Sequence, residues 1–140
     1  MKYMLIMNTP RDGYDQYFAW PQEMLEANMA FMTNFTRKVA AAGELVSGAG
    51  LASPVDARLV RAGAGGKPVT DGVFPEAKEF LAGFWIVDVE NAQRAYELAA
   101  EISTAPGAPV KGADGRTIEH LWVEVREVMG KENCSGDFAT

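Results

Sequence analysis

The sequence has one cysteine and one histidine in 140 residues, so it lacks the residues that build several common sites. Cys134 has no partner for a disulfide within the chain, which excludes a disulfide framework and is typical of a reducing compartment. His120 and Cys134 do not make a usual zinc set, and the carboxylates lack calcium-loop spacing. No dinucleotide, kinase or nucleophile-elbow motif occurs. We therefore expect a cytoplasmic protein with no metal and no cofactor.

Long hydrophobic runs and clusters of positive charge are also missing. The apolar run 3–7 near the N-terminus is too short for a signal-peptide core or a membrane span. The formal net charge is -6, and Arg37-Lys38 is the only adjacent basic pair. Nucleic acid and anionic membrane would both be repelled at long range, so neither is an expected partner.

What is present is the composition of one globular domain. The hydrophobic fraction is 48% and the charged fraction 23%, which excludes wholesale disorder and fibrous repeats. A chain of this length buries enough surface to fold without disulfides. We expect a domain over residues 1–128, followed by a flexible polar tail over 129–140.

Two stretches have the spacing of amphipathic helices. The first runs from Pro21 to Ala42 and ends at Gly43, a residue typical of helix C-termini. The second, 92–103, follows Asn91, a favourable N-cap. The expected buried positions are Leu25, Met29, Met32, Phe35, Val39 and Ala42 in the first helix, and Ala95, Leu98, Ala99 and Ile102 in the second.

Strands are expected at 2–8, within 44–54, at 83–89 and at 117–126, because these stretches are apolar or alternate in polarity. A hairpin is expected over 57–70 around a glycine-rich turn. The segments 8–20 and 104–116 read as loops, the first of them packed by aromatic residues. The order β, α, β, hairpin, β, α, β predicts an α+β fold with a mainly antiparallel sheet and both helices on one face.

The other face of this sheet has no element left in the chain to cover it. Alternation places Leu121, Val123 and Val125 toward the helices and Trp122 on the opposite side, together with either Trp85 or Phe84. Exposed aromatic patches of this kind mark association or ligand binding. We therefore expect a homodimer that packs sheet on sheet, with a partly apolar cavity between the subunits.

The candidate site residues each have a structural and a functional interpretation. Asp71-Gly72 is a common turn pair, but Asp71 could accept a proton or anchor a polar ligand at the cavity mouth. Glu76, Lys78 and Glu79 form either a solvated cluster or a device that positions the 70–79 loop over the cavity.

His120 shares a strand face with Trp122, Glu124 and Arg126, where an imidazole is either structural or an acid/base group. Tyr3, Trp85 and Trp122 belong either to core and interface or to the lining of a cavity.

The stretch around Asp71 resembles the central signature of the YCII-related superfamily, in its DGPF-domain branch. The matching positions are Thr70, Asp71, Gly72, Phe74, Glu76, Lys78, Glu79, Gly83 and Phe84. The likeness extends over the opening MKYMLI, the AAGEL segment and VEVR, to about Val128. Two features depart from the pattern: Val73 stands in place of the proline, and the catalytic His-Asp pair proposed for some members has no counterpart.

The resemblance implies a ferredoxin-like α+β chain that pairs into a dimeric α/β barrel. It leaves two functions open. The first is a small-molecule-binding protein or cofactor-independent enzyme, with Asp71 and His120 handling protons and Lys78, Glu76, Trp85, Trp122 and Arg126 near the ligand. The alternative is a non-enzymatic regulatory module with a sigma-factor partner, since relatives are often linked with such factors.

Overall fold

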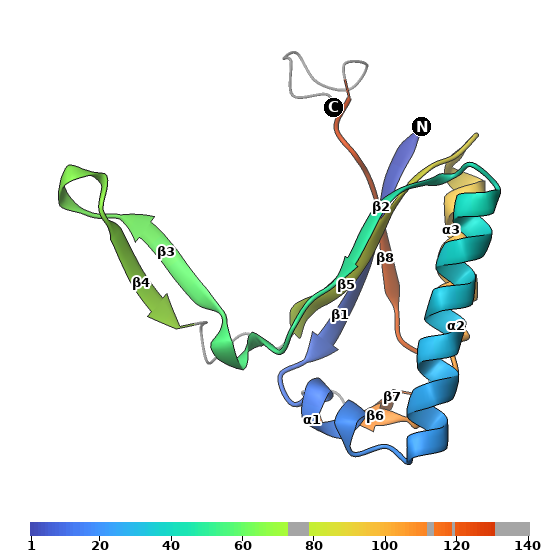
Figure 1. The fold of residues 1–140 in the computed structure, drawn as a ribbon, viewed down its shortest axis with the longest axis horizontal. Helices are drawn as coiled ribbons and strands as arrows, with labels where there is room; N and C mark the ends of the chain where they lie inside the picture. Colours follow the sequence, from blue (N-terminus) through green and yellow to red (C-terminus); the bar gives the residue numbers. More distant parts are fainter. Residues whose placement is uncertain (73–78, 112–113, 119, 131–140) are drawn as a thin grey trace.

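The computed structural model describes residues 1–72, 79–111, 114–118 and 120–130 (Figure 1). Its α-helices are α1 (Gly13–Phe18), α2 (Gln22–Ala41) and α3 (Ala92–Ser103). Its strands are β1 (Lys2–Pro10), β2 (Leu45–Gly50), β3 (Arg58–Ala62), β4 (Pro68–Gly72), β5 (Glu79–Asp88), β6 (Val110–Lys111), β7 (Thr117–Ile118) and β8 (Val123–Glu127). Two short 3-10 turns, Pro54–Asp56 and Ala64–Gly66, flank β3.

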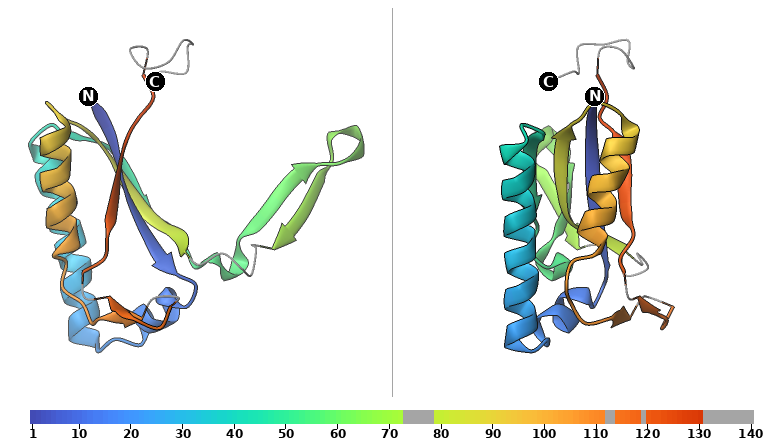
Figure 2. Two further views of the ribbon diagram at one scale, coloured as in Figure 1. Left: turned by 180° about the vertical axis from the view of Figure 1, so that it is seen from behind. Right: turned by 90° about the vertical axis from the view of Figure 1, so that its right-hand side faces the viewer.

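The main sheet contains four strands in the order β2-β5-β1-β8, and every neighbouring pair is antiparallel. Helices α2 and α3 lie on the same side of this sheet (Figures 1 and 2). The predicted α+β class and antiparallel sheet are confirmed, and the arrangement is consistent with a ferredoxin-like fold. Within the described residues the sheet is open and does not close into a barrel.

The core lies between this sheet and the two long helices. Strand alternation places Leu5, Trp85 and Val87 on the covered face, and all three are buried. The ring of Trp85 packs edge-on against Phe35 of α2 at a centroid distance of 5.4 Å. The other buried hydrophobic residues are Tyr3, Val39, Val89, Ala95, Leu98, Ala99 and Ile102.

Both predicted helices are confirmed, but the buried stripe predicted for the first helix is wrong at two positions. Gly43 follows α2 with φ of +74°, a conformation that favours glycine, and Asn91 Oδ1 accepts a hydrogen bond from Arg94 N at the start of α3. All four positions predicted for the buried stripe of α3 are buried. Met29 was expected in the core but is 60% exposed, because the buried residues Phe35 and Val39 turn another side of α2 toward the sheet. Ala42 was also expected in the core but is exposed, since it lies just beyond the last residue of the helix.

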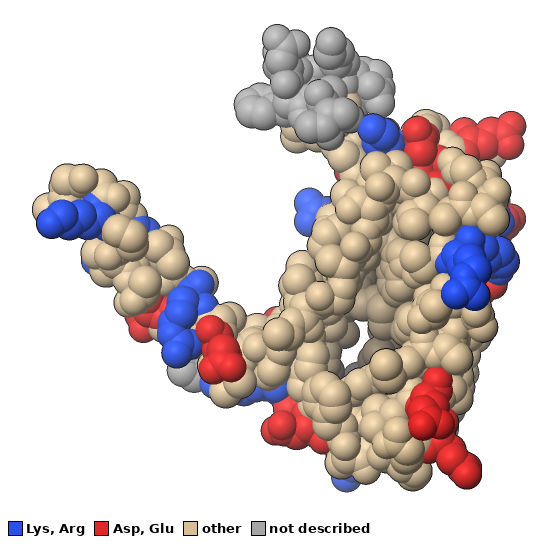
Figure 3. Space-filling model, viewed as in Figure 1, with Lys and Arg blue, Asp and Glu red and all other residues tan. Residues whose placement is uncertain are grey.

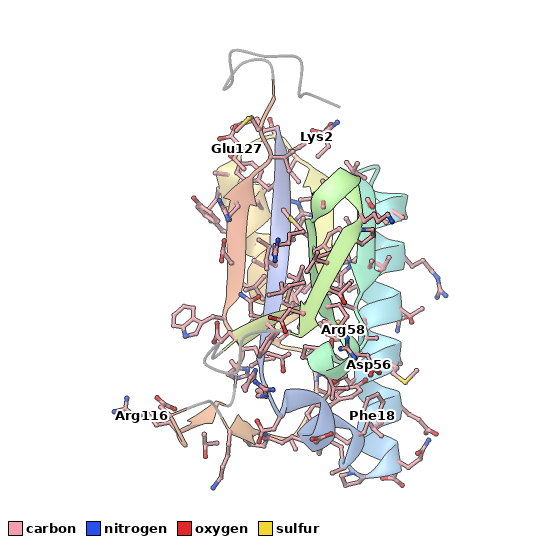
Figure 4. All side chains as sticks on the ribbon, turned by 90° about the vertical axis from the view of Figure 1, so that its left-hand side faces the viewer. Lys2, Phe18, Asp56, Arg58, Arg116 and Glu127 are labelled. Atoms are coloured by element: carbon pink, nitrogen blue, oxygen red, sulfur yellow. The ribbon has the colours of Figure 1, made fainter. Side chains whose placement is uncertain are left out.

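The opposite face of the sheet carries a half-buried apolar strip on its two central strands. Met4 pairs with Ile86 and Ile6 with Phe84, so all four side chains share this face. No helix covers it in the described part of the chain, and Figure 4 looks onto it past the hairpin. Of the two aromatic residues that the sequence left open, Phe84 therefore belongs to the uncovered face.

The predicted hairpin is confirmed as β3 and β4. Its turn contains Gly65 and Gly66 with φ of +66° and +77°, which suits residues without a Cβ. The hairpin projects away from the body of the molecule (Figures 1 and 2), and every residue of both strands is exposed. The 73–78 part of the loop that was expected to roof a cavity lies outside the described residues.

Three local predictions are wrong. The 8–20 segment is not a loop, because β1 continues to Pro10 and α1 follows it. The 104–116 segment contains β6, which pairs with β7. The expected strand 117–126 is interrupted: its first part is β7, and only β8 pairs with β1. Between them the carbonyl of Leu121 accepts a hydrogen bond from the Ser103 hydroxyl instead of a strand neighbour.

Candidate functional site

A cavity of about 790 Å³ lies on the helix-covered side of the sheet. In the space-filling view the molecule is hollowed between the sheet and α2 (Figure 3). The lining residues are Met7, Asn8 and Thr9 of β1; Gly13, Tyr14 and Tyr17 of α1; Trp20; Asn28, Met32, Thr33, Thr36, Arg37 and Ala40 of α2; Leu45, Gly48, Ala49 and Gly50 of β2; Leu51; Ala82, Gly83, Phe84 and Trp85 of β5; and Leu121.

The cavity exists because the strands beneath α2 carry small residues. Gly48 pairs with Trp85 and Gly50 with Gly83 across β2 and β5, so three glycines lie side by side where larger side chains would fill the space. A Cβ added to Gly83 would meet the Ala49 carbonyl oxygen at 2.9 Å, whereas one added to Gly50 would meet nothing within 4 Å. Gly50 therefore borders open space.

A β-bulge adds to the irregularity of this wall. The register of β1 and β5 passes from Met7–Gly83 to Asn8–Leu81, which leaves Ala82 as the extra residue. Its carbonyl accepts a hydrogen bond from Leu51 N at 2.8 Å. Bulges bend a strand and occur often beside functional sites.

Helix α1 closes one end of the cavity. The Tyr14 hydroxyl donates to the Leu51 carbonyl at 2.5 Å and lies 3.5 Å from the Ala82 carbonyl. Gln16 holds the helix from outside, since its side chain makes two hydrogen bonds with the backbone of Lys111 at 2.8 and 3.3 Å. Helix α1 is therefore held to the sheet by the hydrogen bonds of Tyr14 and to β6 by those of Gln16.

An aromatic pair completes this end. The rings of Tyr17 and Trp20 are tilted against each other at a centroid distance of 4.9 Å. The Tyr17 hydroxyl donates to Asn28 Oδ1 at 3.4 Å, and Asn28 Nδ2 donates to the Pro106 carbonyl at 2.9 Å. Trp20 requires glycine at position 107, where a Cβ would come within 2.3 Å of the indole ring.

Helix α2 supplies the opposite wall. Asn28, Met32, Thr36 and Ala40 follow one another at four-residue spacing, so they form a stripe beside the buried one. The Thr36 hydroxyl accepts a hydrogen bond from Trp85 Nε1 at 3.1 Å and donates to the Met32 carbonyl at 2.8 Å. The hydroxyl of Thr36 is thus satisfied within the protein, so the inner part of this wall offers mainly apolar surface to a ligand.

Two exposed side chains of α2, Thr33 and Arg37, stand at the rim of the cavity. They are four residues apart and therefore neighbours on the helix surface. Arg37 lies 3.5 Å from Asn34 Oδ1 and forms no ion pair within the described residues, whereas its neighbour Lys38 is paired with Glu101. Arg37 is the only charged residue among the described residues that line the cavity.

The lining suits binding better than proton transfer. Among the described residues it contains no aspartate, glutamate, histidine or cysteine. Burial raises the pKa of the Tyr14 phenol above its ordinary value, so Tyr14 is a neutral hydrogen-bond donor at physiological pH and not a base. The described part of the chain also holds no group of three or more metal-ligating side chains.

Of the candidate site residues that the structure describes, only Trp85 lines this cavity. Asp71 lies on the projecting hairpin, where its carboxylate accepts a hydrogen bond from Gly72 N at 2.8 Å. The turn expected at Asp71-Gly72 is wrong, because both residues belong to β4 and pair with β3. Glu76 and Lys78 lie outside the described residues. The structure therefore does not gather Asp71 and Trp85 into one site within the chain.

The candidates near the last strand are also dispersed. The His120 side chain is exposed, and its Nδ1 lies 3.1 Å from the Ser103 carbonyl, a contact at the end of α3. Trp122 is 93% exposed. Arg126 lies on the uncovered face, 3.5 Å from its strand neighbour Glu124. Tyr3, also considered for a cavity, is buried in the core.

Several residues that define the cavity were not predicted. Arg37 was noted only as part of an adjacent basic pair, and Tyr14, Tyr17 and Trp20 only as packing residues of a loop. The signal that could have located the cavity is the small-residue run of β2 opposite Gly83. Its meaning depends on strand register and on the position of α2, which are properties of the fold.

Among the described residues no helix is both long enough and apolar enough to cross a membrane.

Comparison with known proteins identifies one family. The family model described as YCII-related domain matches residues 1–109. An uncharacterized protein of Rhizobium meliloti (strain 1021) is 36% identical over 87 residues, which is 62% of this chain and 70% of that protein. The match to the family model includes all of the main sheet except β8, both long helices and most of the cavity lining.

Proposed function

The chain belongs to the family of YCII-related domains, and on that premise we propose that it binds a small, largely apolar organic molecule in the cavity between α2 and the sheet. The observation that carries the proposal is the cavity itself. Its volume of about 790 Å³ lies in the range of small-molecule sites, and its walls combine apolar and aromatic groups with a few polar ones.

Binding is better supported than conversion of the ligand. Cofactor-independent catalysis needs an acid or a base within hydrogen-bond reach of the substrate, and the described lining offers neither a carboxylate nor an imidazole. Asp71 and His120 would have to serve from outside this cavity. For Asp71 that means a site to which a projecting hairpin can be delivered, such as one on another copy of the chain.

A homodimer of the DGPF type, with two sheets packed face to face into an α/β barrel, is part of the same proposal. The uncovered strip of Met4, Ile6, Phe84 and Ile86 supports it, because apolar sheet faces are normally covered. The hairpin adds to the case: an isolated two-stranded ribbon is marginally stable in water, and a second subunit could support it.

The experiment measures binding of the neutral fluorescent probe N-phenyl-1-naphthylamine by the wild type and by Gly50→Phe. A phenyl group at position 50 enters open space in the cavity, so we expect the variant to bind the probe at least about tenfold more weakly. Gly50→Ala is the matched control, because it restricts the backbone similarly and adds only one methyl group. It should bind like the wild type.

Equal binding by the wild type and Gly50→Phe, with both variants folded by circular dichroism, would place the probe elsewhere and contradict the proposal. A wild type that binds no probe would do so as well. Co-purification of a sigma factor with a protein that binds no ligand would favour the regulatory alternative.

A further inference from the structure

The polar groups of the cavity are not equally available to a ligand. Tyr14 donates to the Leu51 carbonyl, Tyr17 to Asn28, and Trp85 to Thr36. These donors therefore hold the protein together. Arg37 is different, since its nearest hydrogen-bond partner is a neutral amide oxygen 3.5 Å away and no carboxylate in the described residues pairs with it.

The described lining of the cavity carries positive charge and no negative charge. Arg37 is cationic, and no described lining residue is acidic. In a chain whose formal net charge is -6, an unpaired guanidinium beside an apolar cavity is not explained by general surface polarity. A guanidinium presents two N–H groups in a fork that matches a carboxylate.

Helix geometry gives Arg37 a companion. Thr33 precedes it by one turn and also lines the cavity, and its hydroxyl makes no hydrogen bond within the described part of the chain. The two side chains lie next to each other on the helix surface. Together they can offer a charged fork and a hydroxyl to one anionic group at the rim, while the rest of the ligand remains inside.

We propose that the ligand is an apolar carboxylic acid, whose carboxylate is held by Arg37 and Thr33 at the rim and whose body fills the space between α2 and the sheet. This inference rests on the proposed function and adds the class of ligand to it. The apolar interior provides general attraction, and the rim selects molecules that end in an anion.

The test compares two probes of one shape, 2-naphthoate and 2-naphthamide, by calorimetry and amide chemical-shift perturbation. The wild type should bind the carboxylate about tenfold more tightly than the amide. Arg37→Gln should remove this preference and leave the affinity for the amide unchanged. Arg37→Lys should keep part of it, because the charge remains and the fork is lost. Thr33→Val should weaken the binding of 2-naphthoate and leave the binding of 2-naphthamide unchanged.

The matched control is Arg61→Gln, which removes one positive charge from the exposed strand β3 and should leave the preference intact. Equal affinity of the wild type for the two probes overturns this inference but leaves the cavity proposal standing. A preference for the carboxylate that survives in Arg37→Gln has the same consequence: it overturns this inference and leaves the cavity proposal standing. If neither probe binds the wild type, or if both bind Gly50→Phe as they bind the wild type, the proposed function itself fails.

Discussion

At the scale of single residues, the ion pair between Glu44 and Arg94 joins the end of α2 to the start of α3. Arg94 Nε lies 2.9 Å from Oε2 of Glu44, and Nη2 of Arg94 lies 2.8 Å from Oε1. The backbone carbonyl of Glu44 also accepts a hydrogen bond from Asp88 N at 2.7 Å. The hydrogen bonds and charge of Arg94 hold the pKa of Glu44 below its ordinary value, although desolvation opposes them.

This pair predicts a pH-dependent contribution to stability. Because the pKa of Glu44 is lower in the folded state, its contribution is complete above the ordinary value of 4.5 and is lost as the pH falls through the lowered pKa. Glu44→Gln should therefore lower the free energy of unfolding at neutral pH by about 1 kcal/mol, since the pair is only partly buried. Urea titrations at several pH values measure this.

Glu97→Gln is the control, because Glu97 contacts the same arginine at 3.5 Å from a more exposed position. It should cost a few tenths of a kcal/mol at most. A Glu44→Gln deficit that stays constant as the pH falls below 4.5 would show that the carboxylate charge is not its cause.

At the scale of elements, α3 shows how far local chemistry alone defines a helix. Its first turn is capped by Asn91, and its stripe of Ala95, Leu98, Ala99 and Ile102 is buried. Both features are visible in the sequence because they depend on residues close together in the chain. Helix α1 is the contrast: Asp12 makes no side-chain cap, and the helix is held instead by Tyr14 and Gln16 reaching distant carbonyls.

The cap of α3 leads to a direct test. Asn91→Ala removes the acceptor for the Arg94 backbone N–H, and should reduce the free energy of unfolding by about 1 kcal/mol. Asn91→Asp should retain nearly all of the stability, because aspartate caps equally well. Chemical denaturation of the three proteins measures the effect. An alanine variant as stable as the wild type would mean that the cap contributes nothing here.

At the scale of the whole molecule, the unbalanced covering of the sheet is the dominant feature. Both long helices lie on one face (Figure 2), while Ile6 and Phe84 meet at the centre of the other. The cavity lies on the helix side, so it is separated from the uncovered face by the sheet. The proposed dimerisation through that face and the proposed ligand binding behind it can therefore be tested separately.

The proposed homodimer predicts that the wild type will be dimeric and Ile6→Lys monomeric at micromolar concentration, as measured by light scattering. A lysine at the centre of an apolar interface would be buried without a partner charge. Met29→Lys is the control, since Met29 is exposed on α2 and outside the cavity lining. It should remain dimeric. A wild type that is monomeric throughout this range would contradict the proposal.

What the sequence by itself determined is most of the main local elements and their layering. The long helices, the hairpin with its glycine turn and the cap at Asn91 all follow from periodicity and from residues that are neighbours in the chain. Strand polarity also identified Val123 and Val125 as the helix-facing side of β8, and both pack against the core.

Only the tertiary structure decided where a ligand could bind. The cavity depends on Gly50 lying opposite Gly83 and Gly48 opposite Trp85, on a bulge at Ala82, and on the distance at which α2 packs over them. It also depends on α1, which long-range hydrogen bonds hold in place. These relations join residues far apart in the chain, so no local pattern contains them, and Arg37 becomes informative only once the space beside it is known.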